Sequence, residues 1–102
     1  MAGIRIRSDR DGELVSVRAL LSHPMETGRR RDTGGATVPA HYIERLTCEH
    51  NGRIVLDTAW GTGIARNPLL GFRLKGTAPG DVLRLHWVDN LGTEDAIVHT
   101  LP

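Results

Sequence analysis

The chain has 102 residues, of which 39% are hydrophobic and 25% are charged, and its formal net charge is +1 at pH 7. This length is that of a single domain over residues 1–102, with one modest core, and the composition is ordinary for a soluble globular protein. No segment reaches the ~20 apolar residues that span a bilayer. The N-terminus lacks an apolar stretch of signal-peptide length, so, taken alone, it favours a cytoplasmic protein or a mature form.

Apolar and polar residues alternate along most of the chain, and this period of two predicts β-strands. Seven runs show it, in chain order 4–7, 15–21, 46–49, 54–60, 70–74, 83–87 and 96–101. In the fourth run Ile54, Leu56 and Trp60 are expected to face inward together. Trp87 lies in a strongly alternating run, so we expect it in the core. No window predicts a helix longer than a short turn.

Turn residues separate these runs. Asp11-Gly12 follows the first run, and Asn51-Gly52 supplies the positive φ angles of a two-residue hairpin before the fourth. Pro79-Gly80-Asp81 and Asn90-Leu91-Gly92 precede the last two runs. Short strands at this spacing without intervening helices predict an all-β protein, an immunoglobulin-like seven-stranded antiparallel β-sandwich.

Two segments interrupt the pattern, at residues 22–40 and 61–68. The first is long for a connection inside a compact domain, and such loops are often functional or mobile. Pro24 makes its start rigid, and Met25 is either an adaptable contact for a partner or a plug that closes the end of its own sandwich. The adjacent Arg29-Arg30-Arg31 favours a solvated loop tip over a small anion site, and no nucleic-acid-binding stripe accompanies it.

Catalytic constellations are hard to find in this sequence. The five histidines lack the spacing of helical metal ligands, which favours scattered surface positions, although His86 and His99 could be neighbours across two strands. Cys48 is the single cysteine, so it forms no internal disulfide, and its place in an alternating strand favours a buried structural thiol over a redox role. We therefore expect no enzyme, no cofactor and no metal, and a binding role by elimination.

A set of short motifs resembles the SoxZ family, the small subunits of the SoxYZ sulfur carrier in bacterial thiosulfate oxidation. In order they are His23-Pro24-Met25-Glu26-Thr27-Gly28, Pro39-Ala40-His41, Glu49-His50-Asn51-Gly52, Trp60-Gly61, Asn67-Pro68, and Trp87-Val88-Asp89-Asn90 followed by Gly92. The resemblance runs from Ile4 to about Thr100. Its specificity comes from the order and spacing of the motifs together.

The resemblance implies a heterodimer with a SoxY-like subunit, which carries sulfur intermediates on a cysteine in a flexible C-terminal arm. Other enzymes would attach thiosulfate to that cysteine, hydrolyse sulfate from it, and oxidise the remaining sulfur. The SoxZ-like chain would be the non-catalytic scaffold, exported to the periplasm with its signal-bearing partner. We predict that the partner-binding residues include His23, Pro24, Met25, Glu26, Trp60 and Pro68. The alternative is an independent ligand- or metal-binding sandwich.

Overall fold

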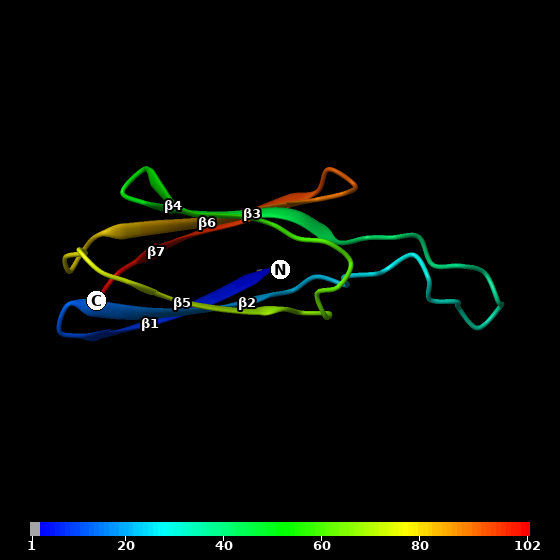
Figure 1. Ribbon diagram of the computed structural model, residues 1–102, viewed down its shortest axis with the longest axis horizontal. Helices are drawn as coiled ribbons and strands as arrows, with labels where there is room; N and C mark the ends of the chain where they lie inside the picture. Colours follow the sequence, from blue (N-terminus) through cyan, green and yellow to red (C-terminus); the bar gives the residue numbers. More distant parts are fainter. Residues whose placement is uncertain (1–2) are drawn as a thin grey trace.

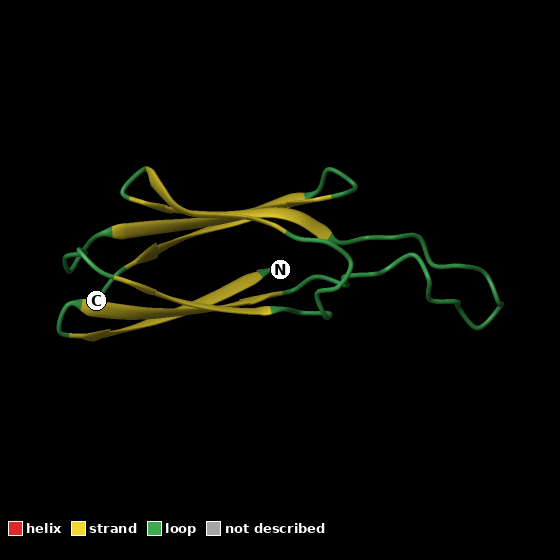
Figure 2. Cartoon of the chain, viewed as in Figure 1, coloured by secondary structure: helices red, strands yellow, loops and turns green. Residues whose placement is uncertain are grey.

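The computed structural model describes residues 3–102, and the regular secondary structure of this part is entirely β (Figures 1 and 2). One antiparallel sheet has the order β1-β2-β5 and consists of β1 (Ile4–Asp11), β2 (Leu14–Leu21) and β5 (Leu69–Leu74). The other has the order β4-β3-β6-β7 and consists of β3 (Ile43–His50), β4 (Arg53–Ala59), β6 (Val82–Asp89) and β7 (Glu94–Thr100). Within the described residues no helix is long and apolar enough to cross a membrane.

The two sheets lie face to face as the layers of a sandwich, which confirms the predicted fold (Figure 1). In immunoglobulin constant domains the fourth strand belongs to the first sheet. Here β4 pairs with β3 instead. The reason is local, because Asn51 and Gly52 have φ angles of 50° and 85° and so form the tight turn that returns β4 beside β3.

The core fills the space between the sheets, and most of its side chains are the apolar positions of the alternating runs. Its buried apolar side chains are Ile4, Val15, Val17, Ala19, Leu21, Met25, Ile43, Leu46, Cys48, Leu83, Leu85, Trp87 and Leu101. The expected inward position of Trp87 is confirmed, since this residue is only 5% exposed. Within the described residues its indole Nε1 has no hydrogen-bond partner.

The prediction for β4 is wrong at Ile54, whose exposed fraction is 57%. The register between β3 and β4 shifts at Cys48 and Glu49, so that Leu56 lies opposite Cys48 whereas Ile54 lies opposite Glu49. This β-bulge adds one residue to β4 and reverses the faces beyond it. Period-two counting cannot anticipate such an insertion.

The long segment predicted to be functional or mobile is an ordered hairpin, which we call the arm (residues 24–40). It projects beyond both sheets along the longest dimension of the molecule, 53 Å (Figure 1). Glu26 and His41 exchange two backbone hydrogen bonds, of 2.6 and 3.0 Å, at its base. Further out, the amide of Val38 donates to the carbonyl of Arg30 at 2.7 Å. Backbone hydrogen bonds therefore hold the arm where no core reaches it.

Candidate functional site

Two histidines at opposite ends of the arm meet at one carboxylate. His23 follows β2, His41 precedes β3, and Asp89 is the last residue of β6. The Nε2 atom of His23 lies 3.0 Å from Asp89 Oδ2, and the Nε2 atom of His41 lies 2.7 Å from the same oxygen. We call these three residues the clasp, because together they close the base of the arm.

The second oxygen of Asp89 is also fully used. Asp89 Oδ1 accepts hydrogen bonds from the backbone amides of Leu91 and Thr93, at 3.0 and 2.9 Å, in the β6–β7 turn. The residue is 2% exposed. Burial alone would raise the pKa of Asp89, but the hydrogen bonds from both histidines and both amides outweigh it and lower that pKa. Asp89 is therefore a buried carboxylate that stays ionised.

Hydrogen bonding fixes the protonation pattern of His23. Its Nδ1 accepts a hydrogen bond from the backbone amide of Met25 at 3.1 Å, so the ring proton belongs on Nε2, which donates to Asp89. The ring also meets Trp87 edge to face, with centroids 5.0 Å apart. His41 is less constrained, because its side chain is 31% exposed and only its Nε2 makes a hydrogen bond among the described residues.

The clasp also brings together three atoms that could hold a metal ion, within 4.8 Å of one another. Coordination through Nε2 of His23 would require the ring proton to move to Nδ1. With a proton on Nδ1, the ring could no longer accept the hydrogen bond from the amide of Met25, because two N–H donors would face each other. The tautomer that these contacts imply therefore suits a hydrogen-bonded clasp better than a metal centre. The expected scattering of histidines is nevertheless wrong for this pair.

The second interrupting segment supports the start of the arm. The side-chain oxygen of Asn67 accepts a hydrogen bond from the amide of His23 at 3.1 Å, and the amide of Asn67 donates to the carbonyl of His23 at 3.0 Å. Next to it, the carbonyl of Pro68 accepts from the amide of Leu21 at 3.0 Å. The two segments that break the strand pattern thus lie together at one end of the sandwich (Figure 1).

The structure divides the six predicted partner-binding residues into two groups. His23, Met25 and Pro68 are buried, whereas Pro24 is exposed and Glu26 and Trp60 are half-buried. For Met25 the structure selects the plug, because this residue is 5% exposed and its sulfur accepts a hydrogen bond from the amide of Ile43 at 3.3 Å. Buried residues of this kind can support a contact surface without forming it. The partner contact itself stays a prediction.

The other histidines form separate pairs. His50 is bonded to Asp81 at 2.8 Å, and His86 to Glu94 at 3.0 Å. Ala96 lies opposite His86 and Leu83 lies opposite His99, so the two histidines are not direct cross-strand neighbours. His99 Nε2 lies 2.7 Å from the hydroxyl of Ser8, and this pair links the edge strands β7 and β1 of the two sheets. Among the described residues no carboxylate forms a hydrogen bond with the imidazole of His99.

Cys48 is a structural thiol, as expected from its position. Its exposed fraction is 0%, and it lies opposite Leu56 and Leu85 in the centre of the four-stranded sheet. Burial, together with the neighbouring charge of Glu49, raises the pKa of this thiol to about 11. At neutral pH only about 10⁻⁴ of it would be thiolate, the reactive form.

Fold and site define a small two-sheet β-sandwich of the immunoglobulin-like class, whose distinguishing feature is an arm clasped at its base. The family model of the sulphur oxidation protein SoxZ matches residues 4–99. The chain therefore belongs to the SoxZ family, which gives it a role in sulfur oxidation. No curated protein sequence matches it.

Solved structures share the fold at low sequence identity. A superoxide reductase in the oxidised state has a TM-score of 0.66 and 20% identity, over 99% of this chain and 88% of that one. The superoxide reductase neelaredoxin from Archaeoglobus fulgidus, in its reduced form, has a TM-score of 0.63 and 18% identity, over 96% and 87%. A hypothetical protein from Pyrococcus horikoshii OT3 gives 0.64 and 19%, over 97% and 87%. These likenesses concern the fold alone.

Proposed function

We propose that this chain is the non-catalytic subunit of a sulfur-carrier heterodimer, in which a SoxY-like partner bears the sulfur intermediates on its C-terminal cysteine. The observation that carries the proposal is the SoxZ family match over nearly the whole chain. In the same proposal the heterodimer works in the periplasm, to which the signal-bearing partner brings this subunit.

The state of Cys48 supports the non-carrier role. A carrier thiol must reach the active sites of several enzymes, whereas Cys48 is fully buried and its pKa is raised to about 11. In the assembled system, Cys48→Ala is expected to leave sulfur transfer unchanged. After incubation with thiosulfate and the system's enzymes, intact-mass analysis should find sulfur adducts on the partner only. An adduct on Cys48 would contradict the assignment.

The arm supports a scaffold role, and we place part of the partner contact there. Pro24 is exposed at its start, the half-buried Glu26 is hydrogen-bonded to His41 of the clasp, and the half-buried Trp60 donates its amide to the carbonyl of Glu44 in β3. The buried His23, Met25 and Pro68 act indirectly, by fixing the position of these neighbours. A rigid, projecting segment loses little conformational entropy on binding, which favours a tight complex.

Co-expression with the SoxY-like chain, followed by size-exclusion chromatography with mass detection, tests the heterodimer. We expect a one-to-one complex that survives dilution to nanomolar concentration, a strength typical of stable interfaces. A chain that stays monomeric in the presence of that partner would refute the proposed function.

A shortened arm tests where the partner binds. Replacement of residues 29–39 by Asn-Gly would join the two legs by a two-residue hairpin beside Gly28 and Ala40, whose Cβ atoms would be 3.2 Å apart if Gly28 carried one. The clasp stays intact in this design. We expect weaker binding to the partner. The control replaces Gly12-Glu13 by Asn-Gly in the β1–β2 turn, at the opposite end of the molecule (Figure 1), and should bind normally. Equal affinity of both variants would remove the outer part of the arm, residues 29–39, from the interface and leave only its base as the contact.

A further inference from the structure

The outer faces of the two sheets differ in how their charges are paired. On the four-stranded sheet, two ion pairs, Arg45–Asp57 and Arg84–Glu49, and one histidine–carboxylate hydrogen bond, His86–Glu94, cross between neighbouring strands. On the three-stranded sheet, four exposed arginines point outward, namely Arg5, Arg7, Arg18 and Arg73. Among the described residues none of these four forms an ion pair or a side-chain hydrogen bond.

The register places like charges side by side on this face. Arg7 of β1 lies directly opposite Arg18 of β2, an arrangement that destabilises a sheet. The next row contains Arg73, Ser16 and Asp9, and Asp11 follows at the end of β1, so two acids are present, but among the described residues no ion pair joins either of them to an arginine of this face. Because the chain itself does not neutralise these opposed arginines, an acidic partner could supply the negative charge.

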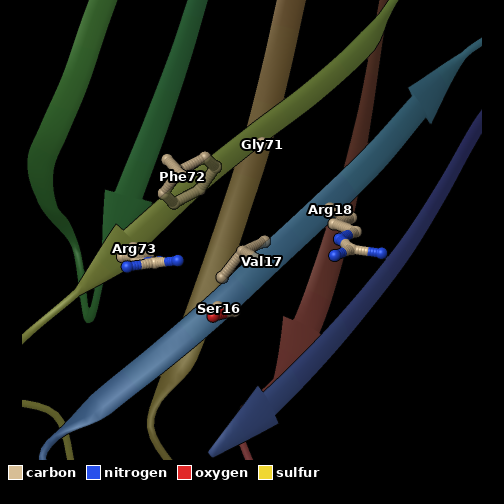
Figure 3. Close-up of a pocket in the computed structure, with 6 residues that line it drawn as sticks. All are labelled: Ser16, Val17, Arg18, Gly71, Phe72 and Arg73. Carbon is tan, nitrogen blue, oxygen red and sulfur yellow. The ribbon is translucent and has the colours of Figure 1, made fainter.

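Glycine and leucine shape the same face. Gly71 of β5 lies opposite Arg18 and leaves a shallow hollow between Arg18 and Arg73 (Figure 3). In the adjacent row Leu20 and Leu69 lie opposite each other, exposed by 40% and 70%, and they line a second hollow with Arg5, Arg7 and Arg18. Arginines around an exposed apolar pair are typical of protein–protein contact surfaces.

We propose that the outer face of the β1-β2-β5 sheet is a docking surface for an acidic protein surface that presents an apolar side chain to Leu20 and Leu69. The inference rests on the proposed function in one respect: the occupant is an enzyme of the sulfur-oxidation system that the heterodimer visits. Arginines that form no ion pair within the chain suit a transient encounter, because their attraction to an acidic partner accelerates association and is screened by salt. A permanent interface would instead require a larger apolar area.

The experiment measures association of the heterodimer, immobilised through its SoxY-like subunit, with each enzyme of the system at low and moderate salt. Arg7→Glu/Arg18→Glu should reduce the association rate with at least one enzyme by about tenfold or more at low salt, with a flatter salt dependence. Leu69→Ser should mainly accelerate dissociation. Each single variant, Arg7→Glu or Arg18→Glu, has its matched control in Arg53→Glu, an exposed arginine at the start of β4 on the other sheet, which changes the net charge equally and should bind like the wild type.

Unchanged association of the double variant with every enzyme would overturn the proposal. So would a duplex oligonucleotide or inorganic thiosulfate that binds this face as tightly as the enzymes do, because the occupant would then not be an acidic protein. Circular dichroism would verify that the variants fold, which is expected because all the substituted side chains are exposed. If the wild-type chain fails to pair with the SoxY-like subunit, the proposed function falls by itself, and the same variants test the face on the lone chain.

Discussion

Substitution of Asp89 by Asn tests the clasp most directly. An amide in place of the carboxylate can still accept from Leu91 and Thr93 through its oxygen, but its NH₂ group then faces two imidazole donors. His41 can change tautomer, because its other ring nitrogen has no hydrogen-bond partner in the described residues. His23 cannot do so without losing the hydrogen bond from Met25. At least one buried donor is therefore left unpaired.

The magnitude follows from this count. A hydrogen bond to a charged group contributes about 1.5–3 kcal/mol, and a buried unsatisfied donor costs about 1–3 kcal/mol. Since the two estimates overlap in part, we expect Asp89→Asn to lower the free energy of unfolding by about 3 kcal/mol at pH 7. Urea unfolding followed by tryptophan fluorescence measures it, because Trp87 packs against His23 in the clasp. A loss below about 0.5 kcal/mol, within the range of surface substitutions, would refute the reasoning.

The pH dependence gives a second, independent check on the same variant. The pKa of Asp89 is lowered in the folded state, so its contribution to stability is fully present above the unfolded value of 3.8 and is lost as the pH falls through the folded value. The difference in stability between wild type and Asp89→Asn should therefore shrink below about pH 4. Asp57→Asn is the matched control, since it removes an exposed partner of Arg45 and should change stability little.

Three further outcomes follow from the core and the arm. Cys48 should react with a thiol reagent only after unfolding, because it is buried and its pKa is raised to about 11; fast labelling of the native chain would contradict this. Met25→Ala should cost about 2–5 kcal/mol of stability, whereas Leu91→Ala, at a position 62% exposed, should cost less than about 0.5 kcal/mol. Gly28→Ala should weaken hydrogen-exchange protection in the arm, because its φ of 85° and its close approach to the opposite leg both oppose a side chain. Gly52→Ala, with the same φ but open space, should leave that protection unchanged.

Much of the fold could be predicted because local rules dominate it. Alternation located all seven strands, and Asn51-Gly52 located the hairpin that decides which sheet β4 joins. Ile54 was misplaced because one inserted residue in β4 reverses its faces. Such a bulge depends on pairing with β3, which the sequence of β4 alone does not contain.

The clasp could not be found by spacing, because its members are far apart in the chain. His23 and His41 are separated by the whole arm, and Asp89 comes from the end of β6. One signal was available, since one histidine stands near the start of residues 22–40, the segment that breaks the strand pattern, and another follows it directly. The arm connects β2 of one sheet to β3 of the other, and its two ends meet through the backbone hydrogen bonds between Glu26 and His41, so a residue pair that brackets it lies at its base. Counting helical ligand spacings was the wrong test for an all-β chain.

The position of the clasp couples the arm to the rest of the sandwich. Asp89 binds both legs of the arm through one oxygen and the β6–β7 turn through the other, so one buried charge connects three segments that are distant in sequence. A proton on that carboxylate would convert the oxygen that receives both histidines into a weaker acceptor, and the arm would lose its fixed angle before the core lost any apolar contact. Any partner that binds the arm would therefore be released in acid ahead of global unfolding. Partner dissociation and tryptophan fluorescence, followed together as the pH falls below about 4, should separate in that order. Coincident transitions would show that the backbone hydrogen bonds between Glu26 and His41 and the buried Met25 fix the arm without the clasp.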